Sequence, residues 1–304
     1  MYLIYILISL LTTINTYAGS CCGGGSSSTQ IMTGDTSSVW RTNYSNQTIL
    51  ADINQSGGIE YRPQSEVEAI KVLNLSFSQK LSDYWQWGAL IPYIEKTKMI
   101  QDNWKSDSGL GDIKFNSAYE IMPEYSRSNF ISQGFLFFEI TLPTAPSIYT
   151  TKRTDSLDTR GTGHYLFSTG TVLKKRQRFG QSLLTLALTY RPSKTFKNSF
   201  FSEDKVITQS SMDHFINISQ DIDLTQKISL NIGISRTYTR NKLTSNFSNK
   251  DQSSLTHPLS LGLNYMQNDY SFLVTYTDEM IIPSGYGHTL GRTVALGIIK
   301  RMNL

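Results

Sequence analysis

Apolar and polar residues alternate with a period of two along most of this chain, from about residue 37 to its last residue. Between Lys227 and Tyr238, for example, small or polar residues alternate with Ile228, Leu230, Ile232 and Ile234. Successive side chains of a β-strand point to opposite faces, so this alternation predicts strands with one apolar and one polar face. No comparable helical period follows the N-terminal leader, and we therefore expect an all-β fold.

The alternating segments predict about twelve strands. They lie near residues 37–53, 67–81, 84–101, 112–122, 130–142, 165–175, 182–192, 212–224, 227–238, 259–267, 270–279 and 293–304. Each has about ten residues or more, which is longer than a typical strand of a soluble sheet and matches a tilted strand that crosses a membrane. Aromatic residues near the strand ends, such as Tyr84, Trp85, Tyr190 and Tyr276, are expected to form girdles at the membrane interfaces.

The predicted connections fall into two sets that alternate strictly along the chain. Short turns are expected at Ser82, Pro123, Arg176, Thr225 and Asn268, and long polar loops at 54–66, 102–111, 143–164, 193–211, 239–258 and 280–292. All long loops therefore leave the same end of the structure, as in outer-membrane barrels. Lipid offers no hydrogen-bond partners, so no strand edge can stay open. We predict a transmembrane antiparallel up-and-down β-barrel over residues 37–304, integral to the outer membrane of a Gram-negative cell.

The N-terminal sequence has the layout of a secretory signal peptide, although its first residues carry no Lys or Arg. An apolar stretch from Tyr2 to Leu11 precedes small residues, and cleavage after Ala18 defines a signal peptide of residues 1–18. The alternative is lipoprotein processing, in which "AGSC" serves as a lipobox and Cys21 is lipidated. Residues 19–36 are rich in Cys, Gly and Ser and are expected to form a flexible periplasmic segment.

Composition and motifs exclude several classes of binding site. The only two cysteines, Cys21 and Cys22, are adjacent and cannot build a tetrahedral zinc site, and we expect no metal and no cofactor. The net charge is a mild +4, and the basic run "KKRQR" at 174–178 is interpreted as a solvated turn, so no nucleic-acid partner is expected. The expected partners are outer-membrane lipid, a small-molecule solute and the barrel-assembly machinery that inserts such proteins.

The stretch "SGLGDIKFNSAYE", which begins at Ser108, contains two glycines and an acidic residue. A phosphate-binding loop requires such glycines to open a helix, whereas here they precede an alternating strand. We therefore predict that Gly109 and Gly111 let the chain turn back into the barrel from an outer loop. This would place Asp112 and Lys114 at the mouth of the pore.

Four short motifs follow one another in the first half of the predicted barrel. They are Pro92-Tyr93, "GLGD" at Gly109–Asp112, "LPT" at Leu142–Thr144 and "GTG" at Gly161–Gly163. Their order resembles the transporter-like outer-membrane barrels grouped as the meta-pathway phenol-degradation family. The glycine that follows "LPT" in that family is replaced by Ala145. The resemblance covers about residues 60–304 and implies a channel-like role without naming a solute.

Alternation also assigns the residues that face the lumen. The charged candidates are Asp112, Lys114, Glu120, Glu139 and Arg191, and the set carries both signs rather than a basic ladder. Burial of Glu139 among apolar residues requires a partner, for which Lys114 or Arg191 is suited, and a structural salt bridge is favoured over a selectivity site.

These observations favour a narrow channel or passive transporter for small solutes, among them hydrophobic or aromatic ones. About twelve strands enclose a narrow pore or a ligand-sized cavity, because the diameter of a barrel grows with strand number. The alternative is a structural or adhesive barrel that acts through its outer loops. An outer-membrane lipid hydrolase is a weaker hypothesis, since His164 and Ser168 share a strand face but lie roughly 13 Å apart. We expect no catalytic residues and no enzyme.

Overall fold

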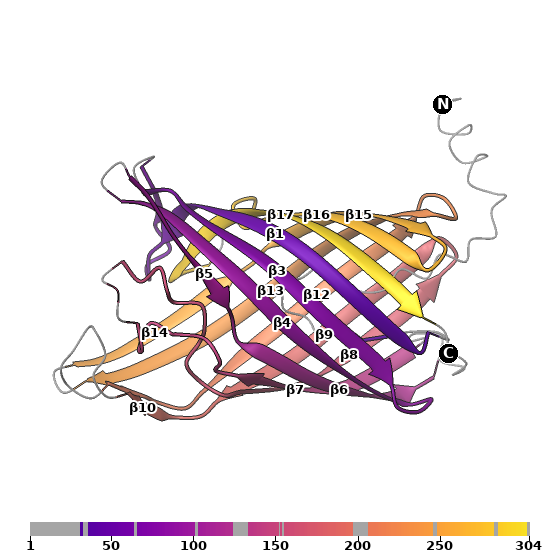
Figure 1. Cartoon of the computed structure of the whole chain (residues 1–304), viewed down its shortest axis with the longest axis horizontal. Helices are drawn as coiled ribbons and strands as arrows, with labels where there is room; N and C mark the ends of the chain where they lie inside the picture. The colour runs from indigo at the N-terminus through magenta and orange to yellow at the C-terminus, as the bar shows by residue number, and fades with distance from the viewer. Residues whose placement is uncertain are drawn as a thin grey trace.

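The computed structural model describes residues 31–32, 36–63, 66–100, 103–123, 133–151, 153, 155–196, 206–245, 248–282 and 285–302. They form one 17-stranded sheet that closes on itself (Figure 1). Twelve of its strands make up the wall and are called the barrel strands: β1 (Ser38–Ile53), β3 (Glu68–Lys80), β4 (Trp85–Ile100), β6 (Ile113–Met122), β7 (Gln133–Leu142), β8 (Leu166–Gln177), β9 (Gly180–Arg191), β12 (Ser211–Asp223), β13 (Ile228–Ser245), β15 (Leu259–Gln267), β16 (Tyr270–Asp278) and β17 (His288–Met302). The predicted twelve-stranded antiparallel barrel is confirmed.

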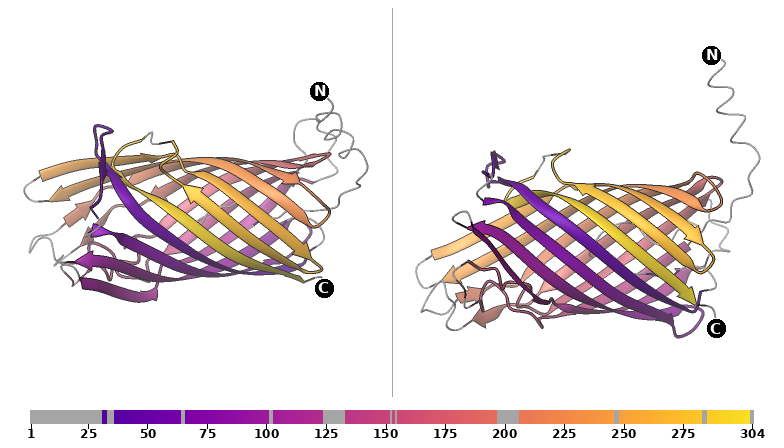
Figure 2. Two further views of the ribbon diagram at one scale, coloured as in Figure 1. Left: turned by 90° about the horizontal axis from the view of Figure 1, so that it is seen from above. Right: turned by 45° about the horizontal axis from the view of Figure 1, so that its top comes forward.

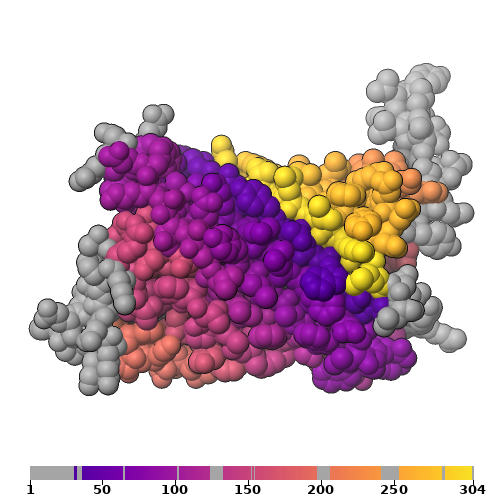
Figure 3. Space-filling model, in the orientation of Figure 1, coloured from indigo at the N-terminus to yellow at the C-terminus, as the bar shows by residue number. Residues whose placement is uncertain are grey.

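The barrel closes between its first and last strands. β1 pairs with β17 from Ser38 opposite Met302 to Ile53 opposite His288, and its other edge pairs with β3. Figure 3 shows the indigo β1 and the yellow β17 lying against each other along this seam. Because both edges of β1 are used, the wall keeps all its ladder hydrogen bonds inside the protein, as a strand surrounded by lipid requires.

The outer surface of the wall is apolar and its inner surface is polar. Exposed side chains on the barrel strands include Leu75, Ile91, Phe115, Leu136, Leu186, Ile218, Leu263, Val274 and Leu296, whereas Asn43, Asn74, Ser229, Asn231 and Asn264 are buried inside. A soluble protein would hide the first group, so this surface faces lipid. The chain is an integral outer-membrane barrel.

The described part of the chain contains no helix that is long and apolar enough to cross a membrane.

The short connections gather at one end of the barrel, called the short-turn end, and the long ones at the other, called the outer end (Figures 1 and 2). β1 begins and β17 ends at the short-turn end. Asn268 in the two-residue turn between β15 and β16 has a φ of 52°, as tight hairpin turns require. The predicted turn at Pro123 leads into residues 124–132, which lie outside the described residues.

Several connections at the outer end are strands, which corrects the prediction of long loops. β5 (Asn103–Leu110) pairs with the outer half of β4, and β14 (Ser248–Thr256) pairs with the outer half of β13. Three shorter strands are β2 (Ile59–Tyr61), β10 (Lys194–Phe196) and β11 (Val206–Thr208). Alternation missed them because strands that extend beyond the lipid need no apolar face.

The "GLGD" motif is a β-bulge rather than a turn from a loop. Two residues of β4, Ile91 and Pro92, lie opposite the three residues from Gly111 to Ile113, between the segments that pair with β5 and β6. The Gly111 N–H donates to the Pro92 carbonyl (2.8 Å). Proline has no backbone N–H, so the bulge leaves no donor of Pro92 unpaired. The extra residue reverses the alternation, so odd positions of β5 and even positions of β6 face inward.

Candidate functional site

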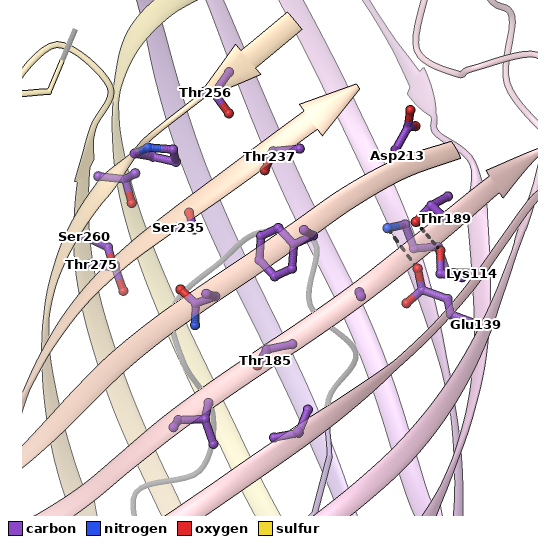
Figure 4. Close-up of a pocket in the computed structure, with 18 of the residues that line it drawn as sticks. Lys114, Glu139, Thr185, Thr189, Asp213, Ser235, Thr237, Thr256, Ser260 and Thr275 are labelled. Carbon is purple, nitrogen blue, oxygen red and sulfur yellow. Dashed lines mark hydrogen bonds and ion pairs between the residues drawn. The ribbon is translucent and has the colours of Figure 1, made fainter. Parts of the chain in front are cut away.

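A cavity of about 530 Å³ lies inside the barrel (Figure 4). Its lining residues come from β1, β3, β6 to β9 and β12 to β17, together with Ile31, Pro258 and Glu279 outside the strands. This volume is in the range of small-molecule sites, which is about 300 to 1,000 Å³. The cavity is therefore large enough for a small solute and is enclosed by the wall on nearly every side.

The two sides of the cavity differ in chemistry. On β7, β8 and β9 the lining includes Phe135, Phe137, Val172, Leu183 and Ala187, which pack with Ile31 into one apolar cluster. On β13, β15, β16 and β17 the lining includes Ser235, Thr237, Ser260, Thr275, Thr277 and Thr293. Figure 4 shows this hydroxyl-bearing side across the lumen from Lys114 and Glu139. A solute in the cavity meets an apolar wall on one side and uncharged hydrogen-bonding groups on the other.

Lys114 and Glu139 form an ion pair across β6 and β7, with Nζ and Oε1 3.4 Å apart (Figure 4). The Glu139 side chain is only 9% exposed, and both residues line the cavity. The expectation that buried Glu139 takes Lys114 as its partner is confirmed. If Lys114 moved away, the buried carboxylate of Glu139 would lose its cation, and this energetic cost keeps the two side chains together.

Arg191 and Glu120 hold other partners and do not line the cavity. The Arg191 guanidinium donates to Asp213 on β12 (3.0 Å), and the Gln133 amide donates to Glu120 (2.7 Å). Asp213 does line the cavity, and sequence reasoning missed it. Its signal was the alternation of β12, where Asp213 lies on the same face as Asn217 and Asp221.

Asp112 fixes the long connection between β7 and β8. Its carboxylate accepts hydrogen bonds from the N–H groups of Ala145 (3.1 Å) and Thr162 (2.7 Å) and from the Thr162 hydroxyl (3.0 Å). The Thr144 hydroxyl donates to the Gly111 carbonyl (2.8 Å) and accepts from the Ile113 N–H (3.1 Å). Asp112 is buried and does not line the cavity. We call these contacts the loop clamp.

Arg160 extends the loop clamp to β5. Its guanidinium is ion-paired with Asp107, and a Cβ added at Gly109 would lie 2.8 Å from Arg160 Nη2. A Cβ added at Gly161 would collide with the Asp112 carboxylate. The glycines of "GLGD" and "GTG" therefore make room for the Arg160 and Asp112 side chains. The motifs at 92–93, 109–112, 142–144 and 161–163, which are spread along the sequence, meet in one cluster at the outer end.

The other side of the same connection rests on an aromatic cluster. The Phe196 ring stacks on Tyr149 (4.6 Å between centroids) and meets His164 edge to face (5.2 Å), and Lys194 Nζ donates to the Gly163 carbonyl (2.6 Å). His164 is buried, and within the described part of the chain neither ring nitrogen makes a hydrogen bond of full geometry, although the backbone of Pro192 lies near the ring. Burial, and then the cations Arg191 and Lys194, lower the pKa of His164 to about 4.

His164 and Ser168, considered above for a hydrolase, take separate partners. The Ser168 hydroxyl is hydrogen-bonded to Thr189 (2.8 Å), while His164 packs against the two aromatic rings.

The basic run at 174–178 is a solvated turn only at its end, where Arg178 lies in the exposed turn after β8. Lys174 to Gln177 belong to β8, and Lys174 is 6% exposed and lines the cavity. Arg41 on β1 also lines it, and sequence reasoning named neither residue as a site candidate. The alternation of β8 could have found Lys174, because it lies two residues after the inward-facing Val172.

Ile31 and Met32 lie within the barrel, in the segment that was predicted to be a flexible periplasmic tail. Ile31 packs in the apolar cluster of the cavity wall, and Met32 packs against Val39 and Ile299. The Met32 N–H donates to the Gln86 side chain (2.6 Å). Residues 1–30, including the predicted signal peptide and Cys21, lie outside the described residues.

No protein-family model and no curated protein matches the sequence. Among solved structures, an outer membrane channel from Pseudomonas putida F1 is similar, with a TM-score of 0.70, 12% identity, and coverage of 89% of this chain and 97% of the channel. The β domain of the Bordetella autotransporter BrkA has a TM-score of 0.47 at 10% identity, covering 88% and 100% of the two chains. The TodX monoaromatic hydrocarbon channel, in a mutant form, scores 0.38 at 11% identity, with 89% and 91% covered. Scores below 0.5 do not distinguish one barrel from another, so the first comparison alone is informative. This chain has the fold of an outer-membrane channel, in agreement with the transporter-like barrel resemblance.

Proposed function

We propose that this protein is a narrow outer-membrane channel or passive transporter for small solutes, among them solutes with an apolar or aromatic body. The observation that carries the proposal is the cavity of about 530 Å³ inside the closed wall, with an apolar side and a hydroxyl-bearing side. The fold shared with the Pseudomonas putida outer membrane channel supports it. A barrel that served only as a support for outer loops would have no need of such a cavity.

In this proposal the five charged candidates have two roles. Lys114 and Glu139 stand in the wall of the solute path, and Asp112, Glu120 and Arg191 hold the surrounding structure. The protein reaches the outer membrane after export, with residues 1–18 removed or Cys21 lipidated, and the barrel-assembly machinery inserts it among the membrane lipids. No catalytic step is part of the function.

The test uses purified protein in planar bilayers and in liposomes. The expected result is a small ion conductance and faster swelling of liposomes in erythritol than in the larger sugar raffinose. A protein that moves no solute of any size or charge would contradict the proposal and favour the adhesive alternative, and release of fatty acid from the liposomes would favour the hydrolase.

A matched pair of variants shows whether the cavity is the path. Ser235→Trp places a large side chain in the cavity, whereas Ile234→Trp places it on the lipid-facing surface of the same strand. We expect Ser235→Trp to reduce conductance several-fold and Ile234→Trp to leave it unchanged. Heat-dependent gel mobility verifies that both variants form the barrel.

A further inference from the structure

The charged side chains that line the outer half of the cavity already have ion-pair or hydrogen-bond partners within the protein. Lys114 is paired with Glu139, and Asp213 accepts from Arg191 (3.0 Å). Glu279 accepts a hydrogen bond from the Gly291 N–H (2.9 Å). A solute in this part of the cavity therefore meets charges that already have partners.

In the short-turn half, two of the described cations that line the cavity, Arg41 and Lys174, have no such partners. Lys174 lies three residues before the end of β8, and its neighbours across the strands are the uncharged Gln133 and Leu183. Arg41 lies three residues after the start of β1, between Ser76 and Ile299. Both line the cavity, and neither has an ion pair or a side-chain hydrogen bond within the described part of the chain.

The acidic residues of this half do not neutralise them. Glu120 accepts from Gln133, and Asp221 accepts from the amides of Gln181 (2.7 Å) and Asn231 (2.5 Å). Asp223, at the end of β12, has Arg176 as its nearby cation, and none of these three carboxylates lines the cavity. β1 and β8 are the first and sixth barrel strands, so Arg41 and Lys174 lie on nearly opposite sides of the lumen, at similar distances from the short-turn end.

A positive charge that lines a largely enclosed cavity favours an anionic occupant, because charge-assisted hydrogen bonds are strong where water is scarce. Lys174 adjoins the apolar cluster, two residues along β8 from Val172 and opposite Leu183. An occupant that fits both the Lys174 ammonium group and the apolar cluster has an apolar body of about one ring and a single carboxylate.

We propose that the short-turn half of the cavity is a binding site for small amphipathic monocarboxylates. Lys174 holds the carboxylate, the adjacent cluster around Phe135 and Phe137 holds the apolar body, and Arg41 attracts the anion from across the lumen. This inference rests on the proposed channel function, since the solute must enter the cavity.

The test measures ion selectivity and block in planar bilayers, with sodium benzoate as the anionic probe and benzyl alcohol as its neutral analogue. We expect chloride to be favoured over potassium and benzoate to block the current at lower concentration than benzyl alcohol. Lys174→Gln should weaken the benzoate block about 10-fold and Arg41→Gln should weaken it less, and both should move the reversal potential toward zero. Block by benzyl alcohol should change less than about two-fold.

The control is Lys175→Gln, which removes the same charge from the next residue of β8, on the opposite face of the strand. Heat-dependent gel mobility shows whether each variant has folded. A wild-type channel that conducts but is not blocked preferentially by benzoate would overturn this inference and leave the channel function intact. The inference would also be overturned if Lys175→Gln weakened the benzoate block as much as Lys174→Gln. A protein that neither conducts nor moves solute would contradict the channel function itself.

Discussion

The outer end of this barrel and the short-turn half of its lumen use charged residues in opposite ways. At the outer end Asp107, Asp112, Glu139 and Asp213 all have hydrogen-bonded or ion-paired partners. In the short-turn half Arg41 and Lys174 line the cavity without partners in the described structure. Charges that are matched inside the protein hold the wall and the connection between β7 and β8 in place. The unmatched ones are available to a solute.

Removal of the Asp112 carboxylate should have the largest effect at the outer end. Asp112→Ala leaves the N–H groups of Ala145 and Thr162 without their acceptor, and hydrogen bonds to a charged group contribute about 1.5 to 3 kcal/mol each. We expect the Ala145 and Thr162 amides to exchange with solvent about 100-fold faster, as measured by hydrogen exchange and mass spectrometry. Asp112→Asn, which keeps an acceptor oxygen, should have a smaller effect. Unchanged exchange in Asp112→Ala would mean that the loop clamp does not depend on this residue.

Breaking the ion pair in the lumen wall should destabilise the whole barrel. Lys114→Met leaves Glu139 buried without its cation, at a cost of about 2 to 3 kcal/mol in the free energy of unfolding. The midpoint of the heat-dependent gel mobility shift should fall accordingly. The double variant Lys114→Met, Glu139→Gln should recover most of the loss, because it removes both charges. If the double variant is no more stable than the single one, the pair is not the source of the effect.

Acidification should loosen the connection over Phe196. The pKa of His164 is about 4 in the folded protein, below its ordinary 6.5, so the closed connection favours the neutral ring. This contribution to stability is complete above about pH 6.5 and is lost as the pH falls through that value toward 4. Hydrogen exchange of residues 145–164, corrected for intrinsic rates, should be roughly 10-fold faster at pH 4.5 than at pH 7. His164→Phe should abolish this difference, and a difference that persists in that variant must have another origin.

The smallest effect is expected from an exposed ion pair on the outward face of β3 and β4, two residues beyond Leu73 and Tyr93 toward the outer end. Lys71 and Glu95 are 3.0 Å apart, and their side chains are 37% and 39% exposed. Pairs of this kind contribute little, so Lys71→Ala should move the same gel-shift midpoint by less than about 2 °C. If the midpoint fell as far as in Lys114→Met, solvent exposure would not determine how much an ion pair contributes to the stability of this barrel.

The sequence allowed most of the wall to be predicted and little of the outer end. The barrel strands followed from alternation, because lipid on one side and the lumen on the other force a strict apolar and polar order on residues such as Phe115 and Lys114. The strand at 103–110 was taken for a loop, because no lipid constrains it. The pair Lys114 and Glu139 was predictable from the burial of Glu139 between neighbouring strands. The contact of Asp112 with Thr162 was not, since it joins positions 50 residues apart through a bulge that reverses the alternation.

The seam between β1 and β17 has a consequence for how the protein is made. Ser37 and Met302, which are hydrogen-bonded at the end of the seam, are 265 positions apart in the sequence. Until the last strand has been synthesised and delivered, the edge of β1 that will meet β17 has no partner and is open to mispairing with other chains. Contacts this distant also form slowly, because a long stretch of chain must first lose its conformational freedom. Removal of the final strand alone is therefore expected to leave an unclosed, aggregation-prone sheet rather than a smaller barrel.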